Sequence, residues 1–288
     1  MANKKRSFKN SFWYTLIMLF VFSFIVPLII QIPISFLNII PSSPQNEFDY
    51  ITLEYLLFPG ITLVSFIILF SLKENKYLRD VLLLKNNKII SGLLLGFLLC
   101  SSRVLIAYLF GNIKLALNDY SFFMLFYSLL CIFIAAVSEE YVFRGYIFNK
   151  TLKDYKNPMF AIMFNSIIFG LLHIFNDGAS VLTTLGAFLV GVMWSLFTYY
   201  SGNIWEAIAF HTMWNYTQTF IYGLPNSGNV SIYSIFKVVD SSSGIAYNKV
   251  YGLEGSIIGV IIDIIVIVII QLIHRKKLGG KNGRQKIR

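Results

Sequence analysis

Eight apolar runs, each about 20 residues or longer, occupy most of this 288-residue sequence. About 20 apolar residues are what an α-helix needs to cross the hydrocarbon core of a bilayer. Only 13% of the residues are charged, about half the share in an average soluble domain. The sequence therefore predicts an all-α, polytopic integral membrane protein with about eight transmembrane helices, near residues 12–38, 52–72, 89–110, 121–148, 159–176, 179–200, 204–222 and 253–273.

The positive charges of the loops indicate the orientation of these helices. Of the 24 Lys and Arg residues, 19 fall in segments that share one side with both termini, and three fall in the opposite loops. Basic residues concentrate on the cytoplasmic side of membrane proteins, so both termini are predicted to be cytoplasmic. The net charge of +10 then reflects topology and contact with membrane lipids, and it gives no reason to expect a nucleic-acid partner.

Three pairs of polar or aromatic residues stand four positions apart in the predicted spans. They are Glu140 with Arg144 in "EEYVFR", Phe169 with His173 in "FGLLH", and His211 with Asn215 in "HTMWN". Residues four apart lie on one face of a helix. Ionisable residues within spans are costly and commonly functional, although a single intramembrane His is more often a structural residue.

The depths of these residues support a shared site. If the chain turns at Lys156, Glu139 and His173 lie 17 residues on either side of the turn, at the same level about 25 Å away. His211 lies seven residues into its own span, about 10 Å deep. These residues are therefore predicted to meet in the inner half of the membrane, at a site that opens to the cytosol.

Such a group of residues suits hydrolysis. A carboxylate beside an imidazole can activate water as a general base, and a second imidazole with an amide can stabilise an oxyanion. Arg144 can neutralise one of the two adjacent carboxylates. The alternative is a zinc site in which Glu139, His173 and His211 bind the metal and leave a position open for water. The residues alone leave both schemes open.

The three motifs, in this order and spacing, resemble the EExxxR, FxxxH and HxxxN/D motifs of the CAAX protease and bacteriocin-processing family of intramembrane proteases. This family is also called type II CAAX prenyl endopeptidase-like or abortive-infection. The resemblance implies that Glu139 and His173 activate water, that His211 and Asn215 line the oxyanion site, and that Glu140, Arg144 and Phe169 support the arrangement. It also favours a metal-free mechanism, with zinc as the alternative.

The resemblance covers roughly residues 120–220 and divides the chain into three parts. Residues 1–119 form N-terminal transmembrane helices, residues 120–222 the catalytic core, and residues 223–288 an outer loop, the last helix and a basic tail. Arg103, Glu206 and Asp263 are left without a role.

The expected function is that of an intramembrane endopeptidase acting on a peptide or a membrane-tethered protein. The expected processes are bacteriocin maturation, self-immunity or the processing of signalling peptides, in a bacterial cytoplasmic membrane. The alternatives are CAAX-type processing of a lipidated substrate and a non-enzymatic immunity or scaffold protein. A transporter is disfavoured because no paired repeats are evident.

Overall fold

The computed structural model describes residues 12–36, 46–69, 88–230 and 233–279, and nearly all of its regular structure is helical. The helices are α1 (Phe12–Phe20), α2 (Val26–Phe36), α3 (Glu47–Ile51), α4 (Phe58–Leu69), α6 (Lys88–Leu109), α7 (Phe122–Glu140), α8 (Asn149–Tyr155), α9 (Pro158–Leu172), α10 (Val181–Ser201), α11 (Trp205–Tyr216) and α12 (Ile257–Gly279). Short 3₁₀ turns stand at His173–Phe175 and Leu253–Gly255.

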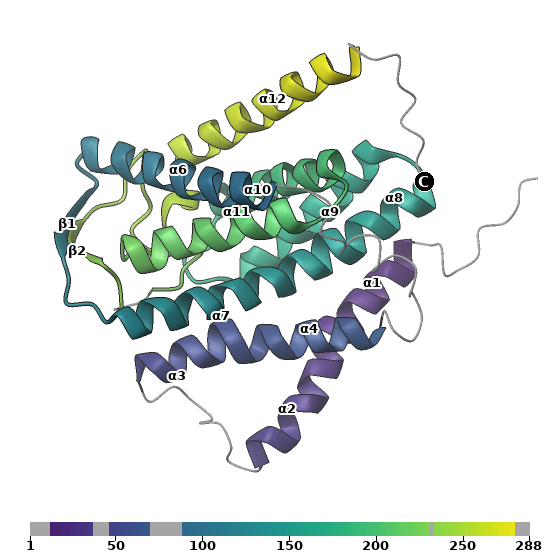
Figure 1. Ribbon diagram of the computed structural model, residues 1–288, viewed down its shortest axis with the longest axis horizontal. Helices are drawn as coiled ribbons and strands as arrows, with labels where there is room; N and C mark the ends of the chain where they lie inside the picture. Colours follow the sequence, from purple (N-terminus) through teal and green to yellow (C-terminus); the bar gives the residue numbers. More distant parts are fainter. Residues whose placement is uncertain (1–11, 37–45, 70–87, 231–232, 280–288) are drawn as a thin grey trace, which may run out of the picture.

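Wider π-helical turns interrupt several of the helices without breaking them. They lie at Val21–Ile25, between α1 and α2, at Thr52–Leu57, between α3 and α4, at Tyr141–Phe148, between α7 and α8, and at Thr217–Ile221, after α11. The stretch from α7 to α8 is thus one helix of 34 residues, Phe122–Tyr155, which runs the length of the molecule in Figure 1.

The predicted all-α membrane architecture is confirmed, with one difference in the number of spans. Seven helices among the described residues are long and apolar enough to cross a membrane. The predicted run near residues 204–222 corresponds to α11 and its π-helical turn, Trp205–Ile221, which is shorter and largely buried inside the bundle. The cytoplasmic location of the termini remains a prediction, and many of the basic residues behind it lie outside the described ranges.

The predicted turn at Lys156 is present. Lys156 adopts the left-handed conformation (φ 52°) and ends α8. The side chain of Asn157 then caps α9 by accepting a hydrogen bond from the backbone N–H of Phe160 at 3.1 Å, and Pro158 occupies the first turn, where proline is favoured. The helices on either side of Lys156 therefore run antiparallel, as the depth argument requires.

Small residues allow α6 to pack tightly against α11, and the two helices lie side by side in Figure 1. A Cβ added to Gly92 would lie 2.6 Å from the carbonyl oxygen of Glu206, and one added to Gly96 would lie 2.5 Å from that of Phe210. Both neighbours are backbone atoms and cannot move aside. These two glycines therefore fix the position of α11, which carries His211 and Asn215.

Replacing Gly96 by alanine is expected to destabilise the protein by ~1–3 kcal/mol, as overpacking of a tight contact does. The matched control is Gly60→Ala in α4, where an added Cβ would meet no atom within 4 Å and where alanine favours the helix by up to ~1 kcal/mol. Thermal unfolding in detergent compares the two variants. Equal midpoints for both would contradict the close contact between α6 and α11.

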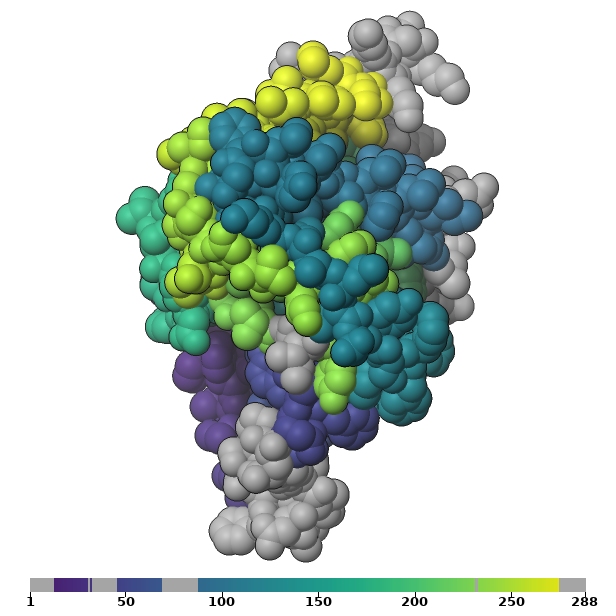
Figure 2. Space-filling model, turned by 90° about the vertical axis from the view of Figure 1, so that its left-hand side faces the viewer, coloured from purple at the N-terminus to yellow at the C-terminus, as the bar shows by residue number. Residues whose placement is uncertain are grey.

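One end of the molecule carries non-helical structure. Strands β1 (Ile113–Leu117) and β2 (Phe236–Ser241) pair in antiparallel fashion with a bulge between Lys114 and Leu115. The connection that contains β2 spreads across this end, which faces the viewer in Figure 2. It folds back among the helices, since Tyr247 and Tyr251 are fully buried. The segment predicted as an outer loop is thus largely part of the packed structure.

Candidate active site

Glu139 and Glu140 end α7, and Arg144 lies in the π-helical turn that follows. Such turns are rare and occur frequently at functional sites. Every residue of Tyr141–Phe148 is buried, so the turn lies in the interior of the bundle. The helix places Arg144 one turn beyond Glu140, and its Nη1 donates to Glu140 Oε1 at 3.0 Å.

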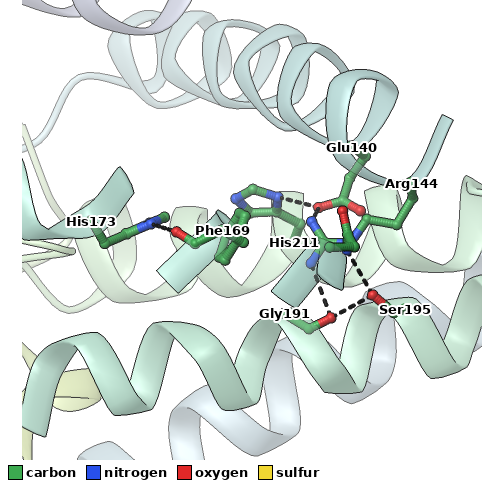
Figure 3. A network of polar contacts seen from close by, with 8 residues as sticks. Glu140, Arg144, Phe169, His173, Gly191, Ser195 and His211 are labelled. Atoms are coloured by element: carbon green, nitrogen blue, oxygen red, sulfur yellow. Dashed lines mark hydrogen bonds and ion pairs between the residues drawn. The ribbon is translucent and has the colours of Figure 1, made fainter. Parts of the chain in front are cut away.

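Glu140 also binds His211, which lies on α11 (Figure 3). The same oxygen, Oε1, lies 3.1 Å from His211 Nδ1, and all three side chains are buried. Because an ionised carboxylate can only accept, Nδ1 of His211 is the donor. The other ring nitrogen points away from Glu140 in Figure 3.

Arg144 is held by further contacts that fix its position. Its Nη2 donates to the carbonyl oxygen of Gly191 at 3.3 Å. Its guanidinium lies 4.7 Å from the ring centroid of Phe169 and 5.1 Å from that of Trp194. Trp194 also stacks on His211 at 4.1 Å. The charged pair is therefore enclosed by aromatic rings, in a setting that strengthens electrostatic interactions.

His173 follows α9 and is oriented by Phe169. Its Nδ1 lies 2.8 Å from the backbone carbonyl oxygen of Phe169, and the two rings are 4.5 Å apart. A carbonyl only accepts, so Nδ1 carries the proton of the neutral imidazole and Nε2 keeps its lone pair. The four-residue spacing of the FxxxH motif has a direct reason here, because the Phe169 ring packs on Arg144 while its carbonyl orients His173.

A cavity of about 320 Å³ brings several of the predicted residues together. Glu139, His173, His211 and Asn215 line it, from α7, the end of α9 and α11. Its lining also includes the aromatic residues Phe143, Phe169, Trp194, Phe210 and Trp214. Glu140 and Arg144 do not line the cavity. The two adjacent carboxylates therefore differ in position, with Glu139 at the cavity and Glu140 in the buried ion pair.

The comparison with protein families agrees with this geometry. Residues 121–217 match the family model described as type II CAAX prenyl endopeptidase Rce1-like. This segment is therefore similar to the Rce1-like family. It covers about a third of the chain, from the N-cap of α7 to the end of α11, and contains all seven predicted site residues. Searches of curated proteins and of solved structures gave no match.

The cavity also extends to residues that the sequence did not predict. Asn176, Asn226, Ser227 and Asn229 belong to its lining, and they lie in the connections that follow α9 and the π-helical turn Thr217–Ile221. These connections are at the end of the helices opposite Lys156. The depth argument placed His173 in the inner half of the membrane, but α9 ends at Leu172, so His173 stands at the far end of its helix. If Lys156 is cytoplasmic, this end of the cavity lies towards the outer side, and the opening to the cytosol stays a prediction.

The zinc alternative requires a group of metal-binding side chains. Within the described ranges, no three His, Cys, Asp or Glu side chains are grouped so that they could hold a metal ion. Glu139, His173 and His211 share one cavity without forming such a group. Catalytic zinc sites need three protein ligands around one point, and these residues do not fit that requirement.

Two further ion pairs contain the residues that the sequence left without a role. Arg103 of α6 pairs with Asp263 of α12, both buried, and the Arg103 guanidinium lies 4.8 Å from the ring centroid of Trp214. Glu206 pairs with Lys88 at 3.2 Å near the start of α11. These residues therefore stabilise contacts of α11 with α6 and of α6 with α12.

Sequence reasoning missed Glu254, Tyr251 and Glu54 as residues of the cavity. Glu254 accepts hydrogen bonds from Trp214 Nε1 at 2.8 Å and from Gln218 Nε2 at 2.9 Å. Burial, with the nearby charge of Glu254, raises the pKa of Tyr251 to about 12, so its hydroxyl stays protonated at neutral pH. Glu54 lies in the π-helical turn Thr52–Leu57, half-buried at the cavity. The one available signal was a carboxylate in the second apolar run.

Proposed function

We propose that the protein is an intramembrane endopeptidase that hydrolyses a peptide bond with water activated by Glu139 and His173. The observation that carries this proposal is the cavity itself, since three separate helices of the Rce1-like segment bring a carboxylate, two imidazoles and an amide to one space of about 320 Å³. This residue set suits acyl transfer to water.

In the proposed reaction, water lies between Glu139 and His173. One of these groups takes a proton from the water, and the oxygen attacks the carbonyl carbon of the scissile bond. The carbonyl oxygen becomes an oxyanion near His211 and Asn215. When the tetrahedral intermediate collapses, the C–N bond breaks and the proton moves to the leaving nitrogen, which regenerates the base.

His211 can act as an oxyanion donor only in one protonation state. Its Nδ1 proton is already engaged by Glu140, so donation into the cavity requires a second proton on Nε2. The Asn215 amide can donate without any such condition.

The proposed substrates are peptides or membrane-tethered proteins in bacteriocin maturation, self-immunity or peptide signalling. The family name also suggests CAAX-type processing of a lipidated substrate as an alternative. A bacterial cytoplasmic membrane is the proposed location. With Lys156 in the cytosol, the end of the cavity lined by Asn176 and Asn226 lies towards the outer side, and we propose access of the substrate from there.

The test is cleavage by the purified protein in liposomes. A randomised synthetic peptide library is incubated with loaded and with empty liposomes, and mass spectrometry identifies new termini. New termini that appear only with the protein are expected. Their absence with every peptide, including lipidated ones, would favour a non-enzymatic immunity or scaffold protein.

Removal of metal is expected to leave cleavage unchanged, because the cavity does not group three ligands. Cleavage is measured after treatment with 1,10-phenanthroline and again after dialysis against EDTA, with thermolysin as a metal-dependent control. A loss of activity that added Zn²⁺ restores would overturn the metal-free proposal.

A further inference from the structure

The ionisable residues that line the cavity are unbalanced in sign. Four are acidic, Glu54, Glu139, Glu254 and Asp263, and two are histidines, while no Lys or Arg of the described residues belongs to the lining. A lining of this kind, enclosed by helices and aromatic rings, has a negative potential that water screens poorly.

Only one of the four carboxylates forms an ion pair among the described residues. Asp263 pairs with Arg103. Glu254 accepts hydrogen bonds from uncharged donors, and Glu54 and Glu139 form no ion pair within the described ranges. Glu54 and Glu139 line the same cavity and carry charge of the same sign. An uncompensated carboxylate inside a membrane protein is costly, and a bound cation would relieve that cost.

Asp263 gives a separate indication that the cavity binds a ligand with hydrogen-bond donors. It is 1% exposed and lines the cavity, yet its Oδ2 has no hydrogen-bond partner among the described residues. Buried carboxylate oxygens are nearly always satisfied. An unsatisfied acceptor at the wall of a cavity suits a ligand that brings N–H groups.

The walls also suit the long stem of a basic side chain. Tyr55, Trp194 and Trp214 line the cavity, and aromatic faces bind guanidinium and ammonium groups. Arg144 shows this arrangement just behind the wall, with its guanidinium against Phe169 and Trp194. Asn176, Asn226 and Asn229 add amide groups that can hydrogen-bond to a peptide backbone.

We infer that the cavity selects peptides with a lysine or arginine beside the scissile bond, and that Glu54 is the carboxylate that recognises this side chain. The inference rests on the proposed endopeptidase function and names its substrate class. Glu139 is assigned to water activation, which leaves Glu54 as its uncompensated neighbour. Glu54 lies outside the Rce1-like segment, on the helix that contributes Tyr55 to the same wall, so the selectivity is a property of this chain.

Glu54→Gln tests the inference, with Glu47→Gln as the matched control. Glu47 lies in the first turn of α3, on the same helix, and does not line the cavity. The randomised peptide library in liposomes reports the ratio of cleavage beside Lys or Arg to cleavage beside Gln. The wild-type protein and Glu47→Gln are expected to prefer basic residues about tenfold, the scale of one charged hydrogen bond. Glu54→Gln is expected to lose most of this preference.

Binding by an inactive variant separates this inference from the proposed function. His173→Ala retains all four carboxylates, and fluorescence anisotropy compares its binding of paired peptides that differ only by Lys or Gln. Selective binding without any cleavage by the wild-type protein would support the inference and overturn the endopeptidase proposal. Cleavage or binding that shows no preference for Lys or Arg, or a preference that Glu54→Gln leaves intact, would overturn the inference.

Discussion

Replacing Glu139 by glutamine is expected to lower peptide cleavage by about 10²–10⁴-fold, the usual contribution of a general base. Glutamine keeps the shape of the side chain but cannot take a proton from water. Glu139 is half-buried at the cavity and forms no ion pair among the described residues. The substitution should therefore leave the fold intact, and the unfolding midpoint in detergent is expected to match that of the wild-type protein. Initial rates of cleavage in liposomes measure the loss.

His173→Ala is expected to cause a loss of similar size, because both residues act on one water molecule. Residues that act as a unit are non-additive, so the double variant should be little worse than either single variant. In the wild-type protein, the hydrogen bond from His173 Nδ1 to the Phe169 carbonyl oxygen orients the imidazole ring. His173→Ala removes this contact at the end of α9 and not inside the helix. Full cleavage in either variant would sink the catalytic assignment and favour the scaffold alternative.

Features that depend on neighbouring residues in the sequence, such as turns and pairs on one helix, could be predicted. The turn at Lys156 follows from "KNP", because asparagine caps and proline begins a helix. The Glu140–Arg144 pair follows from helical spacing alone. The shared cavity of Glu139 and His173 follows from counting residues on either side of that turn. The apolar runs predicted the helices because lipid requires internally hydrogen-bonded spans.

Other features depend on contacts between distant segments and left no local signal. Part of the cavity lining comes from the connections at Asn176 and Asn226. These connections fold back between the helices, and no periodic pattern in their sequence predicts this. Glu54 could be placed near the membrane edge, but its position at the cavity depends on how α3 and α4 pack against α7. The π-helical turns also went unpredicted, since one extra residue per turn barely changes an apolar pattern.

Arg144→Met is expected to produce the largest loss of stability, about 3–5 kcal/mol, because it leaves the Glu140 carboxylate buried without its cation. Both side chains are fully buried, and the guanidinium also donates to Gly191 and packs on Phe169 and Trp194. Methionine can fill the space of the stem but provides neither charge nor donors. A fall of about 10 °C in the unfolding midpoint corresponds to this free energy.

Two further variants separate the buried charge from a general effect of losing a basic residue. Lys114→Met removes the cation of an ion pair with Asp240 in which both side chains are exposed. This variant is expected to leave the unfolding midpoint unchanged, since water screens such pairs. Glu140→Gln combined with Arg144→Met removes both buried charges, so it should recover part of the stability lost in Arg144→Met. It should not recover cleavage, because it removes the carboxylate that accepts the hydrogen bond from His211 Nδ1. Equal unfolding midpoints for Arg144→Met and Lys114→Met would contradict the role of Arg144 in neutralising Glu140. They would also contradict the view that this buried ion pair holds His211 in place.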